Sequence, residues 1–241
     1  MCALLFFFAS VIFRKVTFMT YLPWLIERKL NLFYFSRIKR KIPDFILDSG
    51  VLFVHIPKAA GISVCKSLYG REVGHKRAID YKRADPEAFS RLRKFSIVRC
   101  PYDRVVSAYN FLYFGGMAGY KYDQRFSSFI RSFDSFDDFL FNWLSVRDNK
   151  NKYMHFIPQV EFLCHRDVVL VDSVGRLEEI DEYLFKMNSS WGLDICLSKE
   201  NETKRKVVTR SKVLNNDRLR RRIFDIYRRD FEVLGYDKIP V

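Results

Sequence analysis

Residues 54–63, VHIPKAAGIS, combine groups that can hold a phosphate or a similar anion. An apolar strand should end in this stretch and a helix should begin at Gly61, so that backbone N–H groups and the positive end of the helix dipole face the anion. Lys58 would add a positive charge and Ser63 a hydroxyl donor, while Gly61 lets the backbone approach a ligand closely. The spacing is not the GxxxxGK(S/T) of a nucleoside-triphosphate loop. The pattern indicates an anion site, and the alternative is that Lys58 is an ordinary surface lysine.

A second group of polar residues lies in residues 95–109, FSIVRCPYDRVVSAY. Arg99 should end a strand, and Ser107 should lie about two turns into the following helix. The planar guanidinium of arginine suits bidentate binding of phosphate oxygens, so Arg99 and Ser107 together are candidates for holding a second phosphate. The alternative is that Arg99 pairs with Asp103 and that Ser107 is an ordinary helix residue.

The elements that must position these two segments follow an α/β pattern. Short apolar runs predict buried strands at 51–56, 95–99 and 168–171. Helices are expected at 61–68, 101–114, 135–147, 178–188 and 216–234. The alternation of strands with helices predicts a P-loop-like parallel sheet flanked by helices in a single α/β domain.

The 241-residue chain has a formal net charge of +14. Such a surplus favours an anionic partner, which can be nucleic acid, an acidic membrane surface, or a phosphorylated or acidic substrate. The sequence contains no nucleic-acid recognition module, so we expect no nucleic-acid partner. The five cysteines are scattered and form no CxxC pair. We therefore expect neither a metal site nor a disulfide framework, but buried or partly buried thiols in a reducing compartment.

Residues 1–45 form an apolar and basic N-terminal segment that precedes the domain at 46–241. The apolar run 3–13 is too short to span a bilayer, and Met1-Cys2 lacks the positive start of a secretory signal. Aromatic and basic residues alternate at 29–41, as they do at membrane interfaces. Peripheral membrane contact and packing on the domain are both open. We expect a cytoplasmic protein that can contact the inner membrane of a bacterium, and a Golgi-membrane protein if the source is eukaryotic.

Taken together, the two polar segments resemble those of the carbohydrate sulfotransferases that use 3′-phosphoadenosine 5′-phosphosulfate (PAPS). The first motif of that family usually reads HIPKTAGTS or HIPKTGGTS, and its second motif is Arg-x-Pro-x-x-Arg-x-x-Ser-x-Tyr. The second motif is complete in this chain, at Arg99, Pro101, Arg104, Ser107 and Tyr109. Further similarity lies in HFIPQVEFL (155–163), VGRLEEI (174–180) and YRRDFEVLGY (227–236). The resemblance covers roughly residues 50–237.

The resemblance implies in-line transfer of a sulfuryl group from PAPS to a hydroxyl of a glycan or glycolipid acceptor, without a metal ion. It assigns the 3′-phosphate of PAPS to Arg99 and Ser107. It assigns the 5′-phosphosulfate to Lys58, Ala60, Gly61, Ile62 and Ser63. Similar enzymes also close a polar loop over the nucleotide, and the candidates here are Asn201, Lys204 and Arg205. A solvated run of charges is the alternative reading of that loop.

Two positions depart from the family pattern, because Ala59 and Ile62 replace its usual threonines. The missing hydroxyl at Ile62 removes one contact to the 5′-phosphate, worth about 1 kcal/mol. This loss should weaken PAPS binding without abolishing it, since Lys58, Ser63 and the backbone amides remain. A degenerate, non-catalytic member of the fold is one alternative. A P-loop kinase or NTPase is another, although its usual loop sequence is absent.

Sulfuryl transfer needs a general base for the acceptor hydroxyl and a cation near the leaving group. Lys58 is the natural cation. Among the four histidines, His75 is the first candidate for the base, because related glycan sulfotransferases carry a catalytic histidine between the two motifs. His155 is the second candidate. His55 is expected to pack inside the domain, and His165 is expected at the surface.

Overall fold

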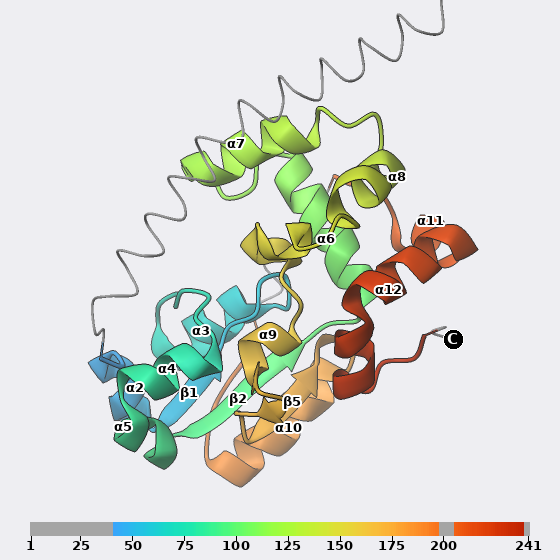
Figure 1. Cartoon of the computed structure of the whole chain (residues 1–241). Helices are drawn as coiled ribbons and strands as arrows, with labels where there is room; N and C mark the ends of the chain where they lie inside the picture. The colour runs from blue at the N-terminus through green and yellow to red at the C-terminus, as the bar shows by residue number, and fades with distance from the viewer. Residues whose placement is uncertain (1–40, 198–204, 239–241) are drawn as a thin grey trace, which may run out of the picture.

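The computed structural model of the protein describes residues 41–197 and 205–238 (Figure 1). Most of the N-terminal segment for which membrane contact was considered therefore lies outside the described residues, as do Asn201 and Lys204. Among the described residues, no helix is both long and apolar enough to cross a membrane.

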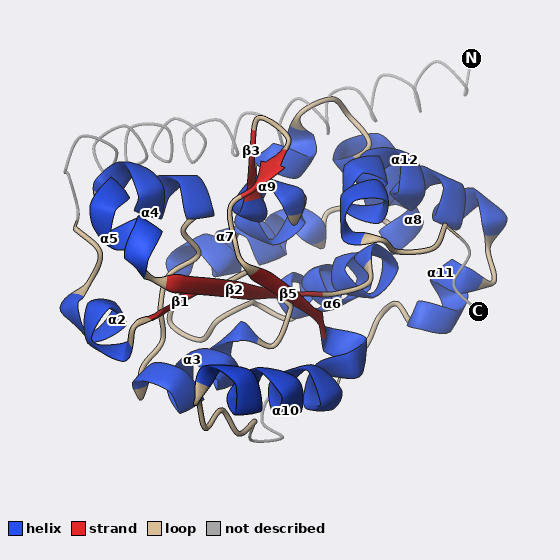
Figure 2. Cartoon of the chain, turned by 90° about the horizontal axis from the view of Figure 1, so that it is seen from below, coloured by secondary structure: helices blue, strands red, loops and turns tan. Residues whose placement is uncertain are grey.

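Three parallel strands form the central sheet, in the order β1 (Val51–Val54), β2 (Arg93–Val98) and β5 (Ser173–Arg176) (Figure 2). All of β1 is buried, and in β2 only Arg93 is exposed. A parallel strand that is covered on both faces needs apolar side chains in both directions, which explains the continuous apolar runs in the sequence.

Helices cover both faces of the sheet (Figure 2). On one side lie α3 (Gly61–Tyr69) and α10 (Ile180–Trp191). On the other side lie α4 (Ala78–Ala84), α5 (Pro86–Arg91) and the short α9 (Val160–Leu163). This arrangement confirms the predicted α/β fold with a parallel sheet flanked by helices. The remaining helix of this part, α2 (Asp44–Ser49), leads into β1.

The other helices pack around α6 (Pro101–Tyr113). They are α7 (Lys121–Ile130), α8 (Phe136–Phe139), α11 (Arg210–Leu214) and α12 (Asp217–Leu234). A dense aromatic core holds them together, in which the rings of Phe126 and Tyr153 stack with their centroids 4.0 Å apart. Ser135 caps α8 as its position suggested, by accepting a hydrogen bond from the Asp138 amide at 3.1 Å. The predicted helix at 135–147 is nevertheless shorter, because a π-helical turn at Leu140–Leu144 ends it.

The predicted buried strand at 168–171 is wrong. Only β4 (Val168–Val169) forms there, and it pairs antiparallel with β3 (Cys164–His165) in a small hairpin whose valines are exposed. The chain joins the parallel sheet later, at β5. A short run of β-branched residues fits an edge hairpin as well as a buried strand, so hydrophobic periodicity does not separate the two. The expectation for the cysteines also needs a correction, because Cys196 is exposed.

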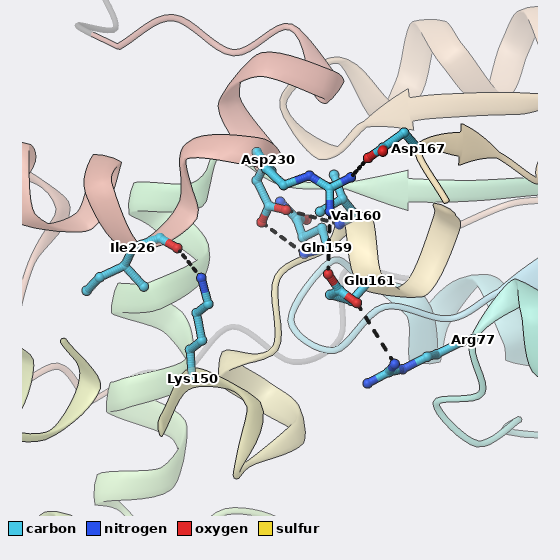
Figure 3. Close-up of polar contacts among 9 residues, drawn as sticks. Arg77, Lys150, Gln159, Val160, Glu161, Asp167, Ile226 and Asp230 are labelled. Carbon is cyan, nitrogen blue, oxygen red and sulfur yellow. Dashed lines mark hydrogen bonds and ion pairs between the residues drawn. The ribbon is translucent and has the colours of Figure 1, made fainter. Parts of the chain in front are cut away.

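Helix α12 bends at Tyr227, whose backbone is not helical (φ −112°, ψ 23°). Lys150 donates a hydrogen bond of 2.9 Å to the carbonyl of Ile226 beside the bend (Figure 3). After the bend, the buried Asp230 carboxylate accepts hydrogen bonds from the main-chain amides of Gln159, at 2.9 Å, and Val160, at 3.0 Å (Figure 3). These contacts attach the start of α9 to α12.

Asp230 also faces the buried charge of Arg104, whose side chain is only 1% exposed. The Nε atom of Arg104 donates a hydrogen bond of 3.0 Å to the carbonyl of Pro57, in the loop after β1. A buried cation needs a nearby anion and hydrogen-bond acceptors. The charge of Arg104 is offset by the nearby Asp230 and its Nε atom bonds to Pro57, while its Nη2 atom is buried without a hydrogen-bond partner among the described residues. Arg104 therefore connects α6 with the loop after β1 and with α12.

We predict that Asp230→Ala lowers the free energy of unfolding by about 3–5 kcal/mol, because it leaves the Arg104 charge buried without its anion and the amides of Gln159 and Val160 without their acceptor. Asp225→Ala removes an exposed carboxylate from the same helix and should change the free energy by no more than about 0.5 kcal/mol. Urea unfolding of both variants measures the difference. Equal effects would show that Arg104 does not depend on Asp230.

Candidate active site

The loop between β1 and α3 has an uncommon backbone. Lys58 and Ala60 both adopt left-handed conformations, with φ of 69° and 57°. Such conformations cost a non-glycine residue about 1 kcal/mol or more and persist only when the surroundings impose them. Here Arg104 holds the carbonyl of Pro57, and the Nη1 atom of Arg99 lies 3.4 Å from the carbonyl oxygen of Lys58. Both arginines of the second motif therefore hold the main chain of the first.

Helix α3 begins without a side-chain cap, so the amides of Gly61, Ile62 and Ser63 at its start are open to an anion. Gly61 is required here for a reason that the sequence did not reveal. A Cβ atom at this position would lie 1.9 Å from Cδ2 of His55, so the imidazole ring fits only against a glycine. Ile62 and Ser63 are partly exposed.

The Lys58 side chain points to α6, where its Nζ atom lies 3.7 Å from the centroid of the Phe111 ring. Burial lowers the pKa of Lys58 to about 8, the neighbouring Arg99 charge also lowers it, and Asp123 acts in the opposite direction. Asp123 is a buried carboxylate that sequence patterns did not single out, and it accepts a hydrogen bond from the hydroxyl of Tyr153. Lys58 is therefore a cation at neutral pH that loses its charge more easily than an ordinary lysine.

Three histidines lie close together at the end of β1. The ring centroids of His55 and His75 are 4.1 Å apart, and those of His75 and His155 are 6.4 Å apart. Nδ1 of His75 lies 3.1 Å from the carbonyl oxygen of His55, and Nδ1 of His55 lies 3.2 Å from the carbonyl oxygen of Val73. Because a carbonyl oxygen only accepts, each Nδ1 must carry the hydrogen, which leaves the Nε2 lone pair of His75 free to accept a proton.

The surroundings of His75 favour its neutral form. Burial lowers its pKa below the usual value, the hydrogen bond to His55 raises it, and the charges of Arg104 and Lys58 lower it further. The net shift is downward, so the ring is neutral at pH 7. A neutral imidazole with a fixed orientation and a free Nε2 has the form that a general base needs.

His155 is more deeply enclosed than His75. Burial and the charge of Lys58 place its pKa well below the usual value, and its Nδ1 atom has no hydrogen-bond partner among the described residues. Its ring lies between those of Tyr153 and Phe111, at centroid distances of 5.4 and 5.2 Å. The fourth histidine, His165, lies apart from this group in β3. In the described part of the chain, no cluster of histidine, cysteine or acidic side chains is suited to a metal ion.

The main chain of Arg99 is fixed by the side chain of Gln159, which accepts from the Arg99 amide at 2.9 Å and donates to its carbonyl at 2.8 Å. The alternative pairing of Arg99 with Asp103 is not formed. Asp103 instead accepts a hydrogen bond from Arg210 at 3.1 Å. The guanidinium of Arg99 therefore remains beside the first loop, without a carboxylate partner among the described residues.

Ser107 is partly exposed on α6, whereas Tyr109 is buried in the aromatic core. Asn110 follows on the same helix and donates a hydrogen bond of 2.8 Å to the carbonyl of Val208. This contact attaches the polar segment that ends near residue 208 to α6. Of the three candidates in that segment, the structure describes Arg205, and its side chain is exposed.

Residues 47–237 match the model of the sulfotransferase family. A search of curated proteins and a search of solved structures returned no match. The family match includes both motif segments, the three neighbouring histidines and α12. It covers well over half of the chain, which therefore belongs to the sulfotransferase family and is a sulfotransferase enzyme.

Proposed function

We propose that this sulfotransferase uses PAPS as its donor and transfers the sulfuryl group to a hydroxyl of a carbohydrate. The observation that carries the proposal is the contact between the two motif segments, in which Arg99 and Arg104 hold the loop that contains Lys58. PAPS carries a phosphosulfate at the 5′ position and a phosphate at the 3′ position of one ribose, so it needs two neighbouring anion sites. The carbohydrate acceptor rests on the resemblance of the motifs to those of carbohydrate sulfotransferases.

The first anion site would hold the 5′-phosphosulfate. The uncapped amides of Gly61, Ile62 and Ser63 provide hydrogen-bond donors at the positive end of α3. Ser63 adds a hydroxyl, and Lys58 adds a charge on the side of α6. Ile62 provides no hydroxyl, so the backbone carries more of the binding here than in relatives with a threonine.

The second anion site would hold the 3′-phosphate between Arg99 and Ser107. Gln159 fixes the main chain of Arg99. The guanidinium forms no ion pair with a carboxylate of the described residues, and the nearby Asp103 pairs with Arg210 instead. The Arg99 guanidinium, which bonds to the Lys58 carbonyl through Nη1, keeps its other N–H groups for phosphate oxygens. Arg205 and the neighbouring Asn201 and Lys204 are our candidates for further nucleotide contacts.

In the proposed reaction, the acceptor hydroxyl oxygen attacks the sulfur atom, and the bond from sulfur to the 5′-phosphate oxygen breaks. The hydroxyl proton goes to Nε2 of His75, and the negative charge that develops on the leaving phosphate is stabilised by Lys58. The second product is 3′-phosphoadenosine 5′-phosphate. The charge of Lys58 also helps to keep His75 neutral before the reaction.

The donor proposal predicts that 3′-phosphoadenosine 5′-phosphate binds at least about tenfold more tightly than adenosine 5′-phosphate, because Arg99 and Ser107 contact only the 3′-phosphate. Arg99→Met should remove most of this preference. Arg91→Met removes the same charge from the exposed surface of α5 and should leave the preference intact. Calorimetric titration of the wild-type protein and the two variants measures their affinities for both nucleotides. Equal affinity of the wild-type protein for both nucleotides would refute the assignment of the second anion site.

The base assignment predicts that His75→Ala lowers kcat by roughly 10²–10⁴-fold while nucleotide binding stays nearly unchanged. The measurement is transfer of labelled sulfate from PAPS to a panel of glycans, for which the wild-type protein should label at least one acceptor. His165→Ala, which changes a histidine outside the candidate site, is the matched control and should retain normal turnover.

Two results would move the base to another residue. If His155→Ala loses turnover and His75→Ala keeps it, the base is His155. If both variants stay active, the base is a carboxylate such as Glu72 or Asp80. A wild-type protein that binds the nucleotide but labels no acceptor in a broad panel would favour a degenerate member of the family.

A further inference from the structure

A cavity of about 300 Å³ lies apart from the residues proposed to hold PAPS. It is a half-open pocket bordered by α4, α9, the β3–β4 hairpin and the part of α12 that follows the bend, and Arg83, Arg166 and Arg229 at its rim are exposed to solvent. Figure 3 shows three residues of this lining: Arg77 just before α4, Glu161 on α9 and Asp167 in the hairpin turn. None of the residues proposed for the two donor anion sites lines the cavity.

The lining is rich in positive charge. Its guanidinium groups belong to Arg77, Arg83, Arg166 and Arg229, and its carboxylates belong to Glu161 and Asp167. Glu161 lies between two of the arginines, 4.0 Å from Arg77 and 3.8 Å from Arg229. Asp167 pairs with Arg229. Within the described residues, neither Arg83 nor Arg166 has a carboxylate partner, so the cavity has two uncompensated positive charges.

The hairpin turn places Arg166 in this lining at an energetic cost. Arg166 and Asp167 form the two-residue loop between β3 and β4, and both have left-handed backbones, with φ of 49° and 65°. Asparagine, aspartate and glycine are the usual residues in such a turn, so Arg166 is the residue whose left-handed backbone is strained. The hydrogen bond between Asp167 and Arg229 holds the turn in this conformation, and the turn places Arg166 in the cavity lining. Strained backbone of this kind is common at binding sites.

We propose that this cavity binds a phosphate monoester. Such a group is tetrahedral and carries close to two negative charges at neutral pH, which matches the charge of the two uncompensated guanidiniums. A sulfate ester carries only one charge and fits less well. Phosphate monoesters occur on soluble metabolites and on lipid headgroups. The exposed Val168 and Val169 next to Arg166 make a lipid headgroup the expected source.

Two probes test the proposal and distinguish the sources. Glycerol 3-phosphate is titrated by calorimetry, and phosphatidylcholine vesicles with and without phosphatidic acid are tested by co-sedimentation. Arg83→Gln/Arg166→Asn should weaken the binding of whichever probe binds by about tenfold for each guanidinium removed. Asparagine is chosen at position 166 because it tolerates the left-handed backbone. Arg147→Gln/Arg221→Gln is the control, since it removes the same charge from exposed residues outside the cavity.

The proposal is supported if a probe binds the wild-type and control proteins but not the cavity variant. Binding of glycerol 3-phosphate then indicates a soluble ester as the ligand, and binding of the phosphatidic acid vesicles alone indicates a lipid headgroup. The proposal is overturned if neither probe binds, or if the control loses as much affinity as the cavity variant. It is also overturned if the cavity variant binds normally, since the ester then occupies another site such as the donor loop.

A third variant keeps the proposal testable if the double variant does not fold. Glu161→Gln removes the carboxylate that competes with the ligand for Arg77 and Arg229. It should therefore strengthen binding severalfold. Unchanged or weaker binding in a folded Glu161→Gln protein would contradict the role of these arginines.

Discussion

The buried guanidinium of Arg104 is the constraint on which the candidate site depends. A charge that is only 1% exposed must be matched inside the protein, and its matching groups come from the loop after β1 and from Asp230 on α12. Asp230 in turn holds the amides at the start of α9, and the side chain of Gln159 from the same turn holds Arg99. Segments that are far apart in sequence are thereby fixed relative to the anion-binding loop.

This arrangement explains why the candidate catalytic side chains, Lys58 and His75, both lie near the end of β1. Lys58 and Ala60 have left-handed backbones, and the Lys58 side chain points to α6. The carbonyl oxygen of His55 bonds to Nδ1 of His75 and so fixes that ring next to the end of β1. The same enclosure lowers the pKa of both groups. At pH 7 most Lys58 side chains are charged, and the lowered pKa of His75 favours its neutral form. The cation that we propose for the leaving group and the base that we propose for the acceptor can therefore coexist at neutral pH.

The sequence predicted those parts of the structure that depend on contiguous patterns. The buried strands near 51–56 and 95–99 and the helix that begins at Gly61 are visible in short windows, and the structure places them as expected. The strand predicted at 168–171 was wrong, because a short β-branched run also fits an exposed hairpin. Contacts between residues that are far apart in the sequence were not predictable from it. Gln159 contacts Arg99 across 60 positions of sequence, and Asp230 resembles a surface residue of an amphipathic helix until the bend in α12 buries it. Gly61 was expected for its backbone freedom, but the structure shows that the ring of His55 also requires it.

The central claim is that the fold presents His75 as a neutral imidazole whose Nε2 atom is free to take a proton. The most direct test is nitrogen-15 NMR of the histidine rings during a pH titration of the full-length protein, with His75→Ala used to assign the signals. The account predicts that His75 carries its hydrogen on Nδ1 at pH 7 and that it titrates below the usual pKa of about 6.5. A hydrogen on Nε2, or a ring that is still protonated at pH 7, would contradict it.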